Sequence, residues 1–273
     1  MQPAKGNSMK RRGFLGVLGS MTAATIPAYP SSSEAGGPHV ISLSFDDGFR
    51  KSFLRIAEIY EKFSLPACFN IIASAHMPGN QVRDDYMKQE QFGAFGVWNE
   101  LQDRGHEIMP HGYRHAHLAS LPLGEAQDLI RKCLDVFSRE LRGFDPKKAV
   151  FNFPYNQSSP ELEAWLPSVV MAFRTTGGVI NPLPQPATVK ITTGGWGPGN
   201  AEKDVDRWVE RLLARPAGWM VYNLHGLDEE GWGPIRPAYL EQLLGRLTKI
   251  DSVRILPAAR VLMQAKSGSL ARS

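Results

Sequence analysis

Short apolar runs alternate with longer amphipathic stretches from residue 38 onward, and this alternation limits the possible folds more than any other feature. The apolar runs predict strands over 39–45, 67–73, 106–109, 148–153, 169–174, 187–193, 218–224 and 253–256. The amphipathic stretches predict helices over 50–63, 87–104, 123–142, 159–166, 201–215, 236–249 and 257–265. Because strands that alternate with helices usually pair in parallel, the pattern favours a (β/α) barrel or an open α/β sheet.

The chain after residue 38 reads as a single domain. The overall composition, with 42% hydrophobic and 21% charged residues, is that of ordinary globular proteins. No repeat, low-complexity segment or interdomain linker interrupts the sequence after residue 38. We therefore expect one domain over 38–273, large enough to be a catalytic domain.

The first 37 residues differ from the rest. The basic run Lys10-Arg11-Arg12 is followed by Gly13-Phe14-Leu15, by a mildly apolar stretch over 17–28 and by three serines. A basic region before a short apolar region is typical of a secretory signal, and the Arg-Arg-x-Phe-Leu pattern resembles the twin-arginine signal. We expect an export signal and flexible linker over 1–37, and a mature protein in the periplasm or outside the cell. A basic tail or an anchor helix is the alternative, but the apolar stretch is too short to span a bilayer, so no stable membrane span is expected after signal removal.

The net charge of +4 is concentrated in the same segment. Three of the four net positive charges lie in the first 37 residues, which carry Lys5, Lys10, Arg11 and Arg12 against Glu34. The rest of the chain is close to neutral, and we expect no nucleic-acid partner. The two cysteines, Cys68 and Cys133, lie in apolar surroundings without a C-x-x-C spacing, which favours buried free thiols over a disulfide.

Two adjacent carboxylates, Asp46 and Asp47, end the first predicted strand within the run Ser44-Phe45-Asp46-Asp47-Gly48. Adjacent carboxylates repel each other, and a bound cation relieves the conflict when one of them ligates it and the other remains free to move protons. An acidic turn closed by Gly48 is the alternative interpretation.

Two histidines, His111 and His115, follow the third predicted strand. Imidazoles four residues apart can face one point on a helical turn, and with one carboxylate they form a ligand set that suits zinc or a similar divalent ion. Histidines on a surface loop are the alternative, because His106 and His117 make the whole region rich in histidine.

Other candidate residues also fall at strand ends. Phe153-Pro154-Tyr155 ends the fourth predicted strand, and Leu224-His225 ends the strand predicted over 218–224. Parallel barrels place their active sites at the carboxyl ends of the strands. We therefore expect the two aspartates, the two histidines, Tyr155 and His225 to form one site.

These motifs resemble those of the polysaccharide deacetylases of carbohydrate esterase family four, whose catalytic unit is also called the NodB-homology domain. The family motifs T/S-F-D-D-G, H-S/T-x-x-H, R-x-P-Y-G and L-H correspond, in the same order, to residues 44–48, 111–115, 152–156 and 224–225. The resemblance covers about residues 39–260. It implies a distorted (β/α) barrel with about seven parallel strands.

The resemblance also implies a chemistry. The ligands of a divalent metal map to Asp47, His111 and His115; zinc is the expected ion, with cobalt, nickel or manganese as alternatives. The catalytic roles map to Asp46 as general base, His225 as general acid and the backbone N–H of Tyr155 as oxyanion donor.

Three positions depart from the family pattern. Asn152 replaces the arginine that pairs with the base, Gly112 replaces a serine or threonine that braces the metal loop, and Asn156 replaces a glycine. Asp46 is therefore expected to lack its usual charged partner, which would leave its pKa higher unless another residue orients it.

The fourth family motif, which supplies the partner of His225, is not identifiable. Asp204 and Asp206 near Trp208 are candidates, but the start of a helix explains both equally well.

The leading hypothesis is a secreted metal-dependent hydrolase that removes acetyl groups, with N-acetyl groups of an amino-sugar polymer as the first choice and O-acetylated glycans still open. The alternatives are a hydrolase of small amides on the same scaffold and a carbohydrate-binding protein that has lost catalysis. Trp196 and Trp232, in loops rich in glycine, are expected either to stack on sugars at the wall of a groove or to pack structurally. The oligomeric state is left open.

Overall fold

The computed structural model describes residues 37–79 and 87–270 of the chain. Gly36–Ser273 forms one compact unit. The export signal predicted for the N-terminal segment lies outside the described residues and stays a prediction. Within the described ranges, the helices are all too short or too polar to cross a membrane.

The predicted strands and helices are all present, and in all but one helix the ends are shifted by only a few residues. The strands are β1 (His39–Phe45), β2 (Cys68–Ile71), β3 (Glu107–Pro110), β4 (Val150–Asn152), β5 (Ala172–Thr176), β6 (Ile180–Asn181), β7 (Lys190–Thr193), β8 (Gly218–Leu224) and β9 (Val253–Ile255). The helices are α1 (Arg50–Glu61), α2 (Phe95–Asp103), α3 (Leu123–Glu140), α4 (Pro160–Trp165), α5 (Ala201–Leu213), α6 (Pro237–Leu247) and α7 (Ala258–Ser267).

Two differences from the prediction have a local cause. The helix expected over 87–104 becomes a short 3-10 turn followed by α2, because Gly93 lies against the ring of Trp98, where a Cβ atom would come within 2.4 Å of the indole, and Ala94 is extended. The two-residue strand β6 was not predicted, and it pairs antiparallel with β8.

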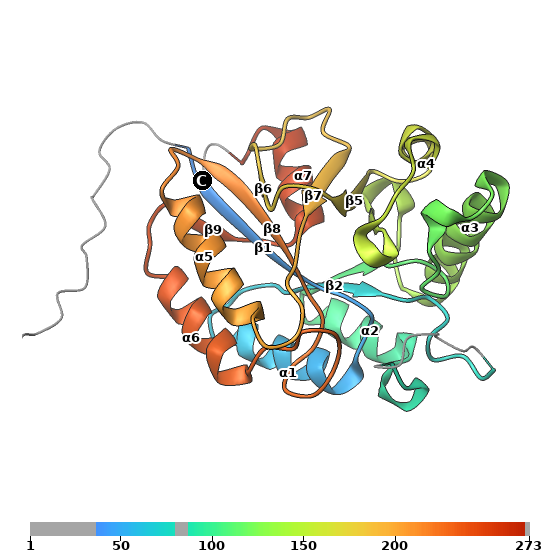
Figure 1. Cartoon of the computed structure of the whole chain (residues 1–273), viewed down its shortest axis with the longest axis horizontal. Helices are drawn as coiled ribbons and strands as arrows, with labels where there is room; N and C mark the ends of the chain where they lie inside the picture. Colours follow the sequence, from blue (N-terminus) through green and yellow to red (C-terminus); the bar gives the residue numbers. More distant parts are fainter. Residues whose placement is uncertain (1–36, 80–86, 271–273) are drawn as a thin grey trace, which may run out of the picture. The chain divides into compact units, whose positions relative to one another are not determined.

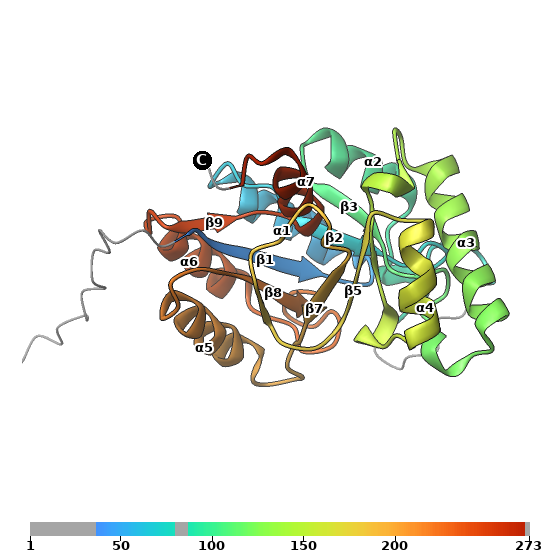
Figure 2. The ribbon, with the colours of Figure 1, turned by 90° about the horizontal axis from the view of Figure 1, so that it is seen from above.

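Eight of the described strands are parallel: β3, β2, β1, β8, β7, β5 and β4 follow one another around the barrel, and β9 pairs with β1. Figures 1 and 2 show the strands at the centre of the domain with helices around them. Backbone ladders join β3, β2, β1 and β8 in one sheet and β4, β5 and β7 in a second sheet. The seams between the sheets are looser: Asn152 Nδ2 donates to the Pro110 carbonyl at 3.3 Å between β4 and β3, and a single bridge joins Gly194 to Tyr222 between β7 and β8. The predicted distorted (β/α) barrel is confirmed.

The interior of the barrel has an apolar half and a polar half, because alternate residues of each strand face inward. Near the amino ends of the strands, apolar side chains pack on α7; they are Val40, Cys68, Val150, Ala172, Ile191 and Trp219. Glu107 of β3 fixes that helix by accepting backbone N–H bonds from Ala259 and Arg260, each at 3.1 Å. Near the carboxyl ends, the buried side chains are polar: Ser44, Asn70, Asn152, Arg174 and Asn223.

The outer faces of the strands pack against the surrounding helices in a second apolar cluster. Cys133 of α3 belongs to this outer cluster, whereas Cys68 lies in the inner one. Both cysteines are buried and free, as predicted.

Candidate active site

The six candidate residues lie at the carboxyl ends of strands, around one mouth of the barrel. The aspartates follow β1, the two histidines follow β3, Tyr155 lies in the turn after β4, and His225 follows β8. A cavity of about 410 Å³ is lined by Asp46, His111, His115, Tyr155 and His225, together with Asn156, Thr176, Gly194, Gly195, Asn223 and Trp232. Asp47 is fully buried.

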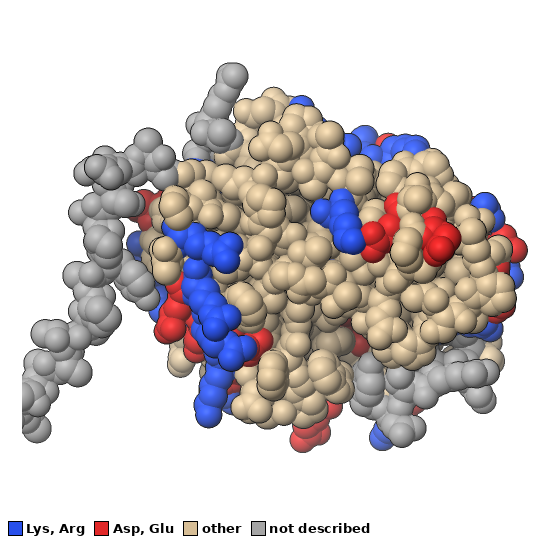
Figure 3. Space-filling model, turned by 45° about the horizontal axis from the view of Figure 1, so that its top comes forward, with Lys and Arg blue, Asp and Glu red and all other residues tan. Residues whose placement is uncertain are grey.

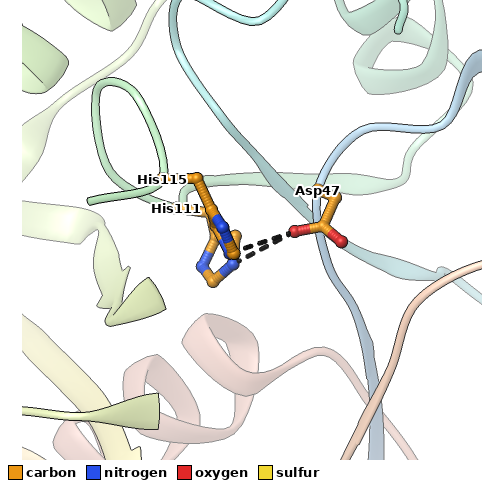
Figure 4. A group of neighbouring side chains, drawn as sticks. All are labelled: Asp47, His111 and His115. Atoms are coloured by element: carbon orange, nitrogen blue, oxygen red, sulfur yellow. Dashed lines mark ion pairs between the residues drawn. The ribbon is translucent and has the colours of Figure 1, made fainter. Parts of the chain in front are cut away.

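Asp47, His111 and His115 form a compact cluster in which one ligand atom from each lies within 4.8 Å of the others. The Nε2 atoms of His111 and His115 lie 3.4 and 3.5 Å from Asp47 Oδ1, and Figure 4 shows both imidazoles turned toward the carboxylate. Neither oxygen of Asp47 accepts a hydrogen bond from a described residue. A buried carboxylate that the protein leaves unsatisfied fits a bound cation, and atoms spaced in this way can share an ion about 2 Å from each.

Left-handed backbone conformations position these ligands. Asp47 has a φ of 82° and His115 a φ of 51°, in a region that non-glycine residues rarely occupy unless the surrounding structure holds them there. Gly112 has a φ of 79°, and a Cβ atom there would lie 2.9 Å from Pro154 Cγ. The serine or threonine of the family pattern therefore does not fit at this position, and the loop is held instead by the bond from Ala73 N–H to the Gly112 carbonyl at 3.0 Å.

His111 is oriented by the backbone of β4. Its Nδ1 lies 2.9 Å from the carbonyl oxygen of Asn152. Because a carbonyl only accepts, Nδ1 must carry the proton, which leaves the lone pair of Nε2 facing Asp47. This is the arrangement that a metal-ligating histidine requires.

Asp46 is surrounded by hydrogen-bond donors. Arg174 Nη1 donates to Oδ1 at 2.9 Å, and Arg174 Nη2 donates to Oδ2. Asn70 Nδ2 donates to Oδ1 at 2.6 Å and Asn223 Nδ2 to Oδ2 at 2.7 Å. The expectation that Asp46 lacks a charged partner is therefore wrong, because a fully buried arginine binds both of its oxygens.

Arg174 lies in β5, which pairs with β4, the strand in which the family pattern has its arginine. Asn152 in β4 and Arg174 in β5 are paired in the parallel register, so the cation has moved by one strand at the same level of the barrel. Asn152 now donates to Asn70 Oδ1 at 2.8 Å and so supports the amide that binds Asp46. Sequence reasoning missed Arg174, although an arginine directly after the apolar run 169–173 needs a buried anion and was the available signal.

These contacts stabilise the ionised form of the Asp46 carboxyl group. Burial alone would raise the pKa of this carboxyl, but the guanidinium of Arg174 and then His111 outweigh it and hold the pKa well below its usual range. Asp46 is therefore ionised at all ordinary pH values.

His225 lies at the edge of the cavity with its ring edge-on to Trp232, at a centroid distance of 5.9 Å. Desolvation lowers the pKa of this imidazole and outweighs the opposite effects of Asp47 and Asp46. None of the hydrogen bonds found among the described residues involves its ring.

Neither aspartate considered as a partner of His225 contacts it. Asp204 accepts a bond from the Tyr222 hydroxyl at 2.8 Å and pairs with Arg207, while Asp206 pairs with Arg246 at 2.5 Å. Both interactions tie α5 to its neighbours, so these acidic residues stabilise the fold.

The turn after β4 is also left-handed. Tyr155 and Asn156 have φ values of 57° and 54°, and asparagine tolerates this conformation better than most residues in the place of the family glycine. The Tyr155 ring stacks on His117 with centroids 3.5 Å apart and contacts the ring of His115 at 4.4 Å. The turn is thus packed against the metal loop.

A sequence profile of the family described as polysaccharide deacetylase matches residues 33–168. The chain belongs to the polysaccharide deacetylase family. It is accordingly a hydrolase of acetyl or amide groups, and the metal dependence of this family agrees with the cluster at Asp47. No curated protein sequence matched the chain.

Solved structures share the fold at low identity. A candidate polysaccharide deacetylase from Mycobacterium smegmatis matches with a TM-score of 0.64 and 14% identity, over 89% of this chain and 95% of that protein. A family 4 acetyl xylan esterase from Clostridium thermocellum, in complex with a cobalt ion, matches with a TM-score of 0.56 and 18% identity, over 82% and 90%. Puue allantoinase matches with a TM-score of 0.64 and 12% identity, over 89% and 95%. At these identities, the matches establish the architecture.

Proposed function

We propose that this protein is an exported, metal-dependent deacetylase that removes N-acetyl groups from an amino-sugar polysaccharide or oligosaccharide. The observation that carries the proposal is the contrast between two adjacent buried carboxylates. Asp47 has no hydrogen-bond donor among the described residues and faces two imidazoles, whereas both oxygens of Asp46 are bound by Arg174 and two amides. One group is suited to ligate a cation and the other to remain an ionised base beside it.

Asp47, His111 and His115 would hold the ion, and the expected metal is zinc because two nitrogens and one oxygen suit it. The chemistry that such an ion supplies when bound is polarisation of the acetyl carbonyl and acidification of a water molecule.

The remaining steps belong to side chains and backbone. Asp46 accepts the proton of the attacking water, and its ionised state keeps it available for that transfer. The backbone N–H of Tyr155 stabilises the negative charge that develops on the acetyl oxygen. His225, which lines the same cavity, protonates the leaving nitrogen, because an amine leaves poorly without a proton.

The test is acetate release from a panel of acetylated substrates by the zinc-loaded full chain. We expect release from N-acetylglucosamine oligomers, with less from acetylated xylan. The matched control is Asp46→Asn, which keeps the shape of the side chain and removes the base. Full metal occupancy without acetate release from any substrate would overturn the proposal.

A small-amide hydrolase is the second candidate, favoured by the likeness to Puue allantoinase and by the limited cavity of about 410 Å³. Activity that rises with oligomer length supports a polymer substrate, because added sugars then contribute binding outside the cavity. Activity on small linear or cyclic amides, with no dependence on oligomer length, supports the second candidate. Glycan binding by the metal-loaded protein without any hydrolysis would instead identify a carbohydrate-binding protein.

The proposal of export rests on the twin-arginine-like N-terminus. Fusion of residues 1–37 to a reporter that is active only after folded export tests it, with Arg11→Lys/Arg12→Lys as the matched control. Reporter activity that does not depend on the two arginines would contradict the assignment.

A further inference from the structure

Basic side chains recur at every fourth position along α5 and the turn that follows it. They are Lys203, Arg207, Arg211 and Arg215, and all four are exposed. A helical rise of about 1.5 Å per residue spaces neighbours by about 6 Å and the two ends by about 18 Å. Figure 3 shows Lys and Arg side chains gathered in a strip on one side of the molecule.

Most of the acidic side chains of α5 point away from the column or are neutralised. Glu202 pairs with Arg236 and Asp206 pairs with Arg246, both on the side of α6. Asp204 is buried and pairs with Arg207.

Three cations of the column form no ion pair with a described carboxylate, and the guanidinium of one of them, Arg211, lies 4.8 Å from the ring centroid of Trp208. These three cations are Lys203, Arg211 and Arg215. Glu210 is the exposed carboxylate of α5, and it likewise forms no ion pair with a described residue. The column therefore presents excess positive charge on a domain that is otherwise close to neutral.

The column is continuous with the active-site cavity through two exposed indoles. Trp232 lines the cavity and is 42% exposed. Its ring packs on Gly197, where a Cβ atom would come within 2.7 Å of the indole. The neighbouring Trp196 is 51% exposed, and the guanidinium of Arg207 lies 5.9 Å from its ring centroid. Aromatic faces of this kind bind the apolar faces of sugar rings, and Arg207, the second residue of the column, connects the indoles to it.

We propose that Trp232, Trp196 and the basic column form an extended binding surface for a polysaccharide whose sugars carry carboxylate groups. The inference rests on the proposed function, since it extends the same site. The glycan would run from the cavity over the two indoles and along α5, where guanidinium groups pair with its carboxylates. An acidic glycan is favoured because the surface combines sugar-stacking aromatic rings with spaced cations.

Direct binding tests this surface without turnover. The protein is the zinc-loaded full chain carrying Asp46→Asn, and the probes are two oligosaccharides of equal length. One alternates N-acetylglucosamine with glucuronate, and the other is a neutral N-acetylglucosamine oligomer. We expect the acidic probe to bind more tightly at low salt and to lose this advantage as ionic strength rises.

The column variant is Arg211→Glu/Arg215→Glu, and the matched control is Lys132→Glu/Arg139→Glu on α3, which reverses the same number of exposed charges. The column variant should weaken binding of the acidic probe about tenfold and leave the neutral probe unchanged. The control should change neither affinity by more than about twofold. Equal melting temperatures of the two variants establish that both remain folded.

Three results would overturn the inference: equal affinity of the wild type for the two probes, an equal loss in the α3 control, or competition by DNA as effective as that by the acidic probe. Because this measurement uses a variant without the base, its outcome does not depend on acetate release. A protein that binds the acidic probe through the column but hydrolyses no acetyl group would retain this inference and lose the proposed function.

Discussion

Asp46 and Asp47 are joined by one peptide bond, yet their surroundings are opposite. Both oxygens of Asp46 accept bonds from Arg174, Asn70 and Asn223. The oxygens of Asp47 accept none from the described residues and face two imidazoles instead. The protein thus supplies hydrogen-bond donors to the Asp46 carboxylate, whereas the Asp47 carboxylate is suited to bind a cation.

The backbone explains how neighbours come to differ so much. Asp46 continues the inward-facing row of β1, after Ser42 and Ser44, and therefore meets the polar interior of the barrel. Asp47 leaves that row through a left-handed conformation and turns toward the loop after β3. A change of backbone conformation at a single residue thus places two chemically identical side chains in different surroundings, one suited to a base and the other to a metal ligand.

The largest effect is expected from disrupting the Asp47 side of this contrast. Asp47→Asn removes the charge that faces the two imidazoles, so metal affinity should fall at least about tenfold. Activity should fall by about a thousandfold, since the ion supplies several kcal/mol of stabilisation. Metal content by mass spectrometry and acetate release are the measurements. Retention of both would show that the cluster is not the metal site.

Disruption of the Asp46 side should separate catalysis from metal binding. Asp46→Asn is expected to lower kcat by about 10²- to 10⁴-fold, the usual contribution of a general base, with unchanged metal content. The same two measurements apply as for Asp47→Asn. Loss of metal in this variant would reassign Asp46 as a ligand.

Arg174 is expected to affect stability and activity together. Arg174→Gln leaves Asp46 as a buried charge without a cation, which should destabilise the fold by about 3–5 kcal/mol in urea unfolding. Asn152→Arg/Arg174→Asn returns the guanidinium from the neighbouring strand, because the two positions are paired in register. Recovery of part of the stability and of kcat is expected. A double variant no better than the single one would show that the side chain acts only through packing.

The smallest expected effect is on the pH dependence. Because the pKa of Asp46 is depressed in the folded state, its ion pair stabilises the protein above the unfolded pKa, near 3.8, and the stabilisation is lost as the pH falls through the folded pKa. In Arg174→Gln the opposing effect of burial dominates and should raise the pKa of Asp46. The acidic limb of kcat/KM should then move to higher pH than in the wild type. Superimposable pH–rate profiles would contradict the role given to Arg174.

Much of the architecture and of the metal cluster could be predicted from the sequence. Apolar periodicity identified the strands and helices, and the spacing of His111 and His115 behind a strand end indicated a metal site. These features depend on residues close together in the chain or on the known geometry of strand ends.

The features that were missed depend on contacts between distant segments. The pairing of Asn152 with Arg174 is set by the register of β4 against β5, which no local pattern encodes. The late start of the expected helix, at Phe95 and not at residue 87, depends on how Trp98 packs against Gly93. The contact of His225 with Trp232 likewise arises from the folding of a loop back onto the end of β8.

Because the barrel wall consists of two sheets, the Asp46–Arg174 ion pair joins one sheet to the other. Asp46 follows β1 of the first sheet, and Arg174 lies in β5 of the second sheet. The bond from His111 to the Asn152 carbonyl also connects the two sheets. The three metal-facing residues all follow strands of the first sheet, whereas Tyr155 follows the second. Loss of these contacts would therefore separate the Tyr155 turn from the metal-facing residues and release the bond that orients His111.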